Sequence, residues 1–347
     1  MKGSVKSIKL KYLLFLFVII LLVTLPVRVY QLFSIVETET GFYTTDDSTI
    51  VLLYVILGIF SAFTIGLSYL SAEIPSPQLP EAKNKLIGTA SAILGVGLLW
   101  NVAGDIIAIL KNMSAKISLI GEGLFSRIFS EQGGFVTIFK TVAAFLGAVY
   151  LFVFCVSHFE GKASYKDQKI LAIMPMFWAM CSLITCLMQE ISYIRISELM
   201  LEMCLYVFAM LFLMNFARVS SGIASEGVMW QIFGFGFPAA LFGILVSVPR
   251  LVLFVMGREF VKDYPFDLSS LAMAAFAVIY IFASLGVGFG GAKEQKGEEY
   301  EEYDIENEDQ AGEEEAERGE ETHIIYDETL DNSAYGENED ASDETEK

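Results

Sequence analysis

Eight long apolar stretches occupy the chain up to residue 288, and they restrict what it can fold into more than any other feature. Each has close to, or more than, the roughly 20 residues that a helix needs to cross the hydrocarbon core of a bilayer. They lie at residues 12–32, 50–70, 86–110, 135–157, 170–188, 198–216, 228–256 and 268–288. Segments of this length satisfy their backbone hydrogen bonds in lipid as helices. The sequence therefore predicts an all-α, polytopic transmembrane helical bundle of about eight spans, in a domain at residues 1–292.

Charge is divided unevenly between this apolar domain and the C-terminal end. Residues 297–347 contain 23 of the 42 acidic residues and only 2 of the 23 basic ones, whereas the rest of the chain is nearly neutral. A segment with so much net charge and so few apolar residues cannot bury a core. We therefore predict a disordered acidic tail at residues 293–347.

The stretch THIIYDETL is the one apolar island in this tail. Its residues Ile324, Ile325 and Tyr326 form a candidate docking motif for a cytoplasmic partner. The alternative is a solvated tail that limits aggregation. Because the tail is strongly negative, a partner is expected to be a basic protein or a divalent cation, and nucleic acid is not expected to bind.

Basic residues favour one orientation in the membrane. With the N-terminus inside, 12 lysine and arginine residues lie in the predicted inner segments and 9 in the outer ones, and four lysines precede the first span. Loops rich in these residues stay in the cytoplasm. No small-x-small cleavage site follows the first apolar stretch, so we expect an uncleaved span rather than a signal peptide. The predicted location is a plasma membrane with both termini cytoplasmic.

Two of the predicted spans carry stripes of small residues that end near a charge. In the third span the stripe is Gly97, Asn101, Gly104 and Ala108, with Asp105 beside it; in the seventh it is Gly236, Ala240, Gly243 and Ser247, ending at Arg250. Small residues let membrane helices approach closely. The similarity of the stripes predicts that the third and seventh spans pack together and that Asp105 pairs with Arg250, with Arg28 as a competing partner.

Charges inside spans usually face protein, pair with one another and mark functional sites. The candidate site residues here are Asp105, Asn101, Arg250, Arg28, Glu198 and Glu202. One interpretation is an outward-facing polar pocket for a small polar or ionic ligand. The other is a ring of structural ion pairs near the membrane surface. The sequence leaves both open.

Motifs of catalysis and metal binding are not found. The chain has two histidines and four cysteines, none of them in a CxxC pair, and it has no HExxH, GxSxG or P-loop motif. Cysteines inside apolar stretches are expected to be packing residues. We therefore expect no enzymatic activity, no cofactor and no metal site.

Residues 28–60 read RVYQLFSIVETETGFYTTDDSTIVLLYVILGIF. This stretch resembles the start of uncharacterised polytopic membrane proteins from clostridia-like Gram-positive bacteria, in which a similar Arg-Val-Tyr-Gln-Leu run ends the first span and an acidic ETGFY loop follows. The resemblance covers about a tenth of the chain. It implies a bacterial plasma membrane location, and it brings no activity and no site residues.

Together these features favour a non-enzymatic integral membrane protein that acts as a sensor or accessory protein, with an outward-facing polar pocket and a tail that recruits a cytoplasmic partner. One alternative is a small-solute or ion transporter, for which Pro175 and Pro238 mark candidate breaks in spans. A further alternative is a structural membrane scaffold. The lipid bilayer is the expected partner in each case, and the oligomeric state is left open.

Overall fold

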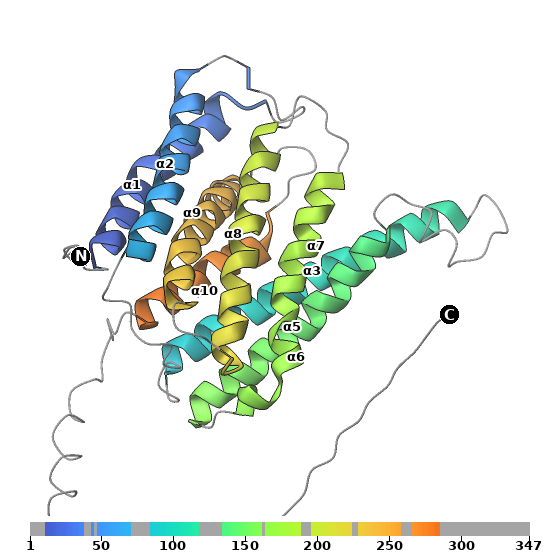
Figure 1. Ribbon diagram of the computed structural model, residues 1–347. Helices are drawn as coiled ribbons and strands as arrows, with labels where there is room; N and C mark the ends of the chain where they lie inside the picture. The colour runs from blue at the N-terminus through green and yellow to red at the C-terminus, as the bar shows by residue number, and fades with distance from the viewer. Residues whose placement is uncertain are drawn as a thin grey trace, which may run out of the picture. The chain divides into compact units, whose positions relative to one another are not determined.

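The computed structural model describes residues 11–37, 43–44, 47–70, 84–117, 134–161, 164–188, 196–223, 228–257 and 266–284. These residues are helical apart from short connections and an isolated antiparallel bridge between Val36 and Tyr43. The helices are α1 (Lys11–Ser34), α2 (Ser48–Leu70), α3 (Lys85–Ile117), α5 (Gly134–Glu160), the 3₁₀ helix η1 (Ser164–Asp167), α6 (Lys169–Ala172), α7 (Met174–Met188), α8 (Ile196–Ser220), α9 (Val228–Val255) and α10 (Leu268–Ser284) (Figure 1). The chain divides into two units, Met1–Phe289 and Gly290–Lys347, and these helices all belong to the first.

Seven segments in the described part of the chain are long and apolar enough to cross a membrane, and α10 is a shorter apolar helix of 17 residues. Their order and type confirm the predicted all-α polytopic bundle. The protein is a multi-pass membrane protein. The predicted boundaries agree closely with the helices, as for 135–157 and the observed Gly134–Glu160.

The fifth predicted span consists of two helices rather than one. α6 ends at Ala172, and α7 begins at Met174 with Pro175 in its first turn. Proline lacks an N–H group and fits the first turn of a helix, where that group would have no helical partner. The carbonyl of Ile173 accepts hydrogen bonds from the N–H groups of Met176 and Phe177 at 3.1 and 3.2 Å. The break therefore lies one turn from the end of this span.

Helix α9 is the most buried of the spans, and α1, α2, α8 and α10 pack around it (Figure 1). α3 and α5 run side by side as a long pair, and α7 packs between α5 and α8. Helix α10 contacts both α3 and α9. Pro238 and Pro249 lie within α9 without interrupting it.

Glycines set the closest approaches around α10. A Cβ atom added to Gly97 of α3 would lie 2.8 Å from the Cβ of Ala272, and one added to Gly243 of α9 would lie 2.8 Å from the Cβ of Ala274. Both small-residue stripes therefore pack against α10. The prediction that the third and seventh spans pack directly on each other is wrong, because α10 lies along both of them.

The outer half of the α3 stripe does not form such a close helix contact. A Cβ atom added to Gly104 would meet nothing within 4 Å, and Gly104 and Ala108 are both exposed. The stripe thus has two parts with different surroundings. Only the part near Gly97 is buried in the bundle.

Candidate functional site

Ionisable side chains gather at one end of the bundle, where α1, α7 and α9 finish and α2, α5, α8 and α10 begin. We call this the charged end. It collects residues that are more than 200 positions apart in the sequence, from Arg28 to Arg250. The six candidate residues named from the sequence all lie here or within two turns of it.

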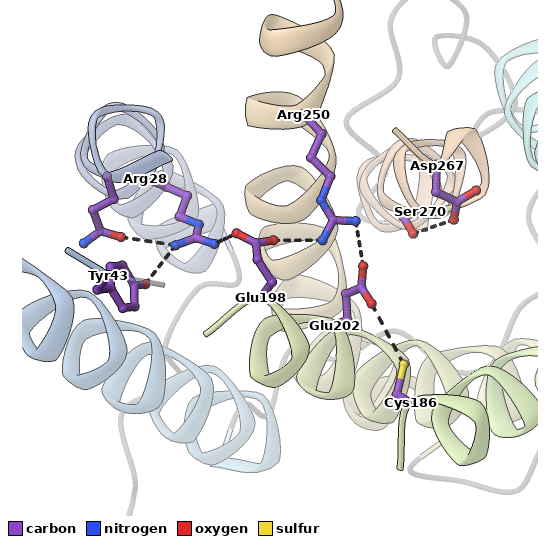
Figure 2. Close-up of polar contacts among 9 residues, drawn as sticks. Arg28, Tyr43, Cys186, Glu198, Glu202, Arg250, Asp267 and Ser270 are labelled. Carbon is purple, nitrogen blue, oxygen red and sulfur yellow. Dashed lines mark hydrogen bonds and ion pairs between the residues drawn. The ribbon is translucent and has the colours of Figure 1, made fainter. Parts of the chain in front are cut away.

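Four of these residues form a continuous line of alternating charges (Figure 2). Glu198 lies between two guanidinium groups: Arg28 donates to one of its carboxylate oxygens, and Arg250 Nη2 donates to the other at 2.8 Å. Arg250 Nη1 also donates to Glu202 Oε1 at 2.6 Å. We call Arg28, Glu198, Arg250 and Glu202 the charge chain. It connects α1, α8 and α9.

Local structure explains how the sequence builds the charge chain. Glu198 and Glu202 are four residues apart, so they lie one turn apart on the same face of α8. Glu198 is in the first turn of α8, where the helix dipole favours a carboxylate. Arg28 and Arg250 come from the last two turns of their helices, at the same level.

The charge chain is almost completely buried and electrically balanced. The side chains of Arg28, Glu198 and Arg250 are 1%, 4% and 5% exposed, and that of Glu202 is 14% exposed. Removing a charge from water is costly unless a counter-charge and hydrogen bonds replace the water. Two guanidinium groups and two carboxylates meet this condition for one another.

Neutral side chains extend the charge chain at both of its ends. Arg28 Nη1 donates to Tyr43 Oη at 3.1 Å and to Gln31 Oε1 at 3.3 Å. Tyr43 is paired through its backbone with Val36 and packs against Leu32, Val36 and Leu253. At the other end, Cys186 Sγ lies 4.0 Å from Glu202 Oε2 (Figure 2). Glu202 is therefore the most exposed and least tightly held member of the charge chain.

A second ion pair joins α3 to α5. Lys140 Nζ donates to Asp105 Oδ1 at 2.8 Å, and Thr141 Oγ1 lies 3.3 Å from Asp105 Oδ2. One turn earlier on α3, Asn101 Oδ1 accepts a hydrogen bond from Trp178 Nε1 at 3.3 Å. These contacts attach α3 to α5 and to α7.

The predicted pairing of Asp105 with Arg250 is wrong. Asp105 pairs with Lys140, and Arg250 pairs with Glu198 and Glu202. Arg28, predicted as the competing partner of Asp105, instead binds Glu198. The physical reason is the position of α10, which separates the helices that carry Asp105 and Arg250. The structure thus places four of the six candidate residues in the charge chain. Asp105 and Asn101 lie outside it and bind side chains of α5 and α7.

Several residues of the charged end were not among the sequence candidates. Lys140 carries a detectable signal, because it is a lysine inside an apolar stretch and α3 and α5 are consecutive spans. Asp267 has a local signal as well: it caps α10, accepting from the backbone N–H of Ser269 at 3.1 Å and from Ser270 Oγ at 2.9 Å. Tyr43 and Cys186 reach the site only through tertiary packing.

The side chains gathered at the charged end form ionic contacts between helices. In the described part of the chain, no group of three or more histidine, cysteine, aspartate or glutamate residues could hold a metal ion. What the arrangement can do is hold helices together and exchange ionic partners. The tail residues Ile324, Ile325 and Tyr326 lie outside the described residues, so the docking motif stays a prediction. Comparisons with protein-family models, curated proteins and solved structures find no match to this chain.

Proposed function

We propose that the protein is a non-enzymatic sensor or accessory protein of the bacterial plasma membrane. In this proposal the charged end responds to a small polar or ionic ligand on the outer side, and the acidic tail recruits a basic partner in the cytoplasm. Both termini are cytoplasmic in this arrangement, which follows from the distribution of lysine and arginine. The proposal rests on one observation above all, the buried charge chain.

The charge chain supports a responsive role because its members have exchangeable partners. Glu198 holds two guanidinium groups at once, and Arg250 holds two carboxylates at once. Each of these two central residues therefore keeps one partner when an ionic ligand takes the other, and the released residue is an end member such as Glu202, whose side chain is 14% exposed. Because α1 is attached to α8 by Arg28 and Glu198, such an exchange changes how firmly α1 is held.

Glu202 is the member at which a ligand would first act. Its side chain is the most exposed of the four, and its second oxygen has a long contact of 4.0 Å to the Cys186 sulfur. A ligand shifts an equilibrium only through different affinities for two states. Here the two states differ in whether Glu202 or the ligand neutralises Arg250.

The transporter alternative has less support from the described helices. Transporter sites lie beside helices that are interrupted near the middle of the membrane. The break between α6 and α7 lies one turn from the end of the span, and α9 is continuous through Pro238. The scaffold alternative uses the same ion pairs as permanent attachments, and the experiment below separates it from the sensor.

The test is a quantitative pull-down with the full chain in nanodiscs as bait, compared with a chain that lacks residues 297–347. We expect a soluble protein that is enriched by the full chain and lost with the tail. We also expect Glu202→Gln to change its recovery, because the amide keeps the shape of the side chain but not its charge. Glu160→Gln, an exposed carboxylate on α5, is the matched control and should have no effect.

Equal recovery with and without the tail would remove the recruiting role. Recovery that depends on the tail but not on Glu202 would show a scaffold rather than a sensor. In both cases the amount of folded bait is measured first, so that loss of folding is not read as loss of recruitment.

A further inference from the structure

The end of the bundle opposite the charged end contains a histidine with an unusual environment. His158 lies in the last turn of α5 and is fully buried, with 0% exposure. Its Nδ1 lies 2.9 Å from the carbonyl oxygen of Phe154, which can only accept a hydrogen bond, so Nδ1 carries the proton. Nε2 is buried and has no hydrogen-bond partner in the described part of the chain. A neutral His158 therefore keeps a bare lone pair out of contact with water.

Two aromatic rings that also touch each other pack against this imidazole. Its ring centroid lies 4.2 Å from that of Phe154 and 5.5 Å from that of Tyr165, and the Tyr165 ring is tilted from it by only 22°. Phe154 and Tyr165 also contact each other, with ring centroids 4.8 Å apart. The imidazole is thus held between its own helix and the 3₁₀ helix that follows.

Tyr165 is the residue that closes the site. It is 2% exposed, whereas Ser164, Lys166 and Asp167 in the same four-residue helix are exposed. Burial raises the pKa of the Tyr165 hydroxyl, so Tyr165 is neutral and supplies no negative charge. Tyr165 attaches η1 to α5 at this point through its contacts with His158 and Phe154.

The groups around His158 are neutral where they are buried. The titratable side chains on the elements packed here are Tyr150 and Cys155 of α5, Tyr165 of η1 and Tyr280 of α10, and the charged ones are Lys85 of α3, Glu160 of α5, Lys166 and Asp167 of η1, Lys169 of α6 and Arg218 of α8. All of the charged ones are exposed except Arg218, which is half-buried. None of them has a hydrogen bond or ion pair to His158 among the contacts of the described residues.

We propose that His158 and Tyr165 form a proton-operated latch, in which neutral His158 holds η1 against α5 and a proton on Nε2 releases it. The added proton turns Nε2 into a buried donor with no acceptor among the described residues, and it places a charge where these residues supply no counter-charge. Moving Tyr165 away lets water reach Nε2. The face of Phe154 and the C-terminal end of α5, which both favour a cation, stay beside the ring in the released state.

The sign of the pH dependence follows from this difference. The closed state disfavours the extra proton, and the released state accepts it as an ordinary histidine does, near pH 6.5. Falling pH therefore favours release, and rising pH favours the closed latch. The latch lies at the opposite end of the bundle from the charge chain, so it does not depend on the function proposed for that end.

The experiment is hydrogen exchange of the full chain in nanodiscs, followed by mass spectrometry of peptides that cover residues 164–172. Two amides report directly: Gln168 N–H, which donates to the Tyr165 carbonyl at 3.2 Å, and Ala172 N–H, which donates to the Gln168 carbonyl at 3.1 Å. After correction for intrinsic exchange, protection should fall about tenfold or more between about pH 7.5 and about pH 5.5.

Three variants sharpen the test. His158→Phe keeps an aromatic ring but cannot take a proton, so its protection should not depend on pH. His323→Phe removes the other histidine of the chain and should behave as the wild type. Tyr165→Ala should be released throughout the range. A fall in His158→Phe that equals the wild-type fall would overturn the proposal, as would constant protection in the wild type.

A second measurement does not require His158→Phe to fold. In the His323→Phe chain labelled with ¹⁵N-histidine, the imidazole signals belong to His158 alone. We expect them to titrate with the same midpoint as the loss of protection. An imidazole that titrates while protection stays constant would contradict the latch, and so would an imidazole that stays neutral while protection is lost.

Discussion

The two ends of the bundle bury polar groups in different ways. At the charged end, Arg28, Glu198 and Arg250 are ions held by ions from other helices. At the other end, which we call the aromatic end, Tyr150 donates to Ser220 Oγ at 2.8 Å among the rings of Phe154, Phe216 and Tyr280, which meet edge to face. An ion needs its particular partner, whereas a neutral hydroxyl among rings can be replaced by an apolar group of the same shape at small cost. The charged end therefore specifies which helices are neighbours, and the aromatic end mainly fills space.

The largest effect is expected from Glu198→Ala. Among the described residues, the substitution removes the carboxylate partner of Arg28 and one of the two carboxylates that pair with Arg250. Removing one partner of a buried ion pair costs about 3–5 kcal/mol. The free energy of unfolding, measured by titrating mixed micelles with SDS and following circular dichroism, should fall by this order.

Met200→Ala is the matched control for Glu198→Ala. Met200 lies half a turn further along α8 and is 45% exposed, so its truncation should cost far less. A loss for Glu198→Ala as small as that for Met200→Ala would mean that the charge chain does not hold the helices together.

The next effect concerns the glycines that face α10. Gly97→Ala and Gly243→Ala each place a Cβ atom 2.8 Å from another Cβ atom, so backbones must shift. Overpacking of this kind costs about 1–3 kcal/mol. Gly104→Ala meets nothing within 4 Å and should be neutral or slightly stabilising, because alanine is the better helix former. The same unfolding titration measures all three, and equal losses would show that α10 does not pack as described.

A smaller effect is expected at the pair of Asp105 and Lys140, whose side chains are 15% and 11% exposed. Lys140→Ala should cost about 1–2 kcal/mol, between the values for exposed and buried pairs. Exchanging the two residues, Asp105→Lys with Lys140→Asp, should recover much of this stability. Exchanging Asp105 with Arg250 should not recover this stability. Recovery in the second exchange and not in the first would restore the pairing expected from the sequence.

The sequence predicted the helices well because the physics that creates them is local. A run of apolar residues long enough to cross lipid must satisfy its own backbone, so length and composition alone locate most of the helices within a few residues. The exceptions are α3, which continues to Ile117 beyond the predicted end at residue 110, and the fifth span, which is divided between α6 and α7. The small-residue stripes were also interpreted correctly as packing faces near Gly97 and Gly243. These conclusions need no knowledge of which helix lies beside which.

The partners of the charges could not be predicted because they depend on that missing knowledge. Asp105 and Arg250 have opposite charges at similar depth, which is what a pair would show, but α10 lies along both of their helices. Lys140 was the better partner, since α3 and α5 are consecutive antiparallel spans. The latch residue Tyr165 gave no signal at all, because a single tyrosine in a short connection looks like any polar loop residue.

The smallest effect is expected at the aromatic end, from Tyr150→Phe. The substitution removes the hydroxyl that donates to Ser220 Oγ, but Ser220 keeps its own hydrogen bond to the carbonyl of Ala217 at 3.3 Å. A side-chain hydrogen bond between membrane helices contributes about 0.6 kcal/mol on average, and the loss should be of this order.

Ser220→Ala should cost more than Tyr150→Phe, because it leaves the Tyr150 hydroxyl buried without its acceptor. The double variant should then cost about as much as Tyr150→Phe alone, since no buried donor remains. No such rescue is available for Glu198, whose removal takes the carboxylate partner from Arg28 and one of the partners from Arg250. If Tyr150→Phe cost as much as Glu198→Ala, the distinction between the two ends would fail.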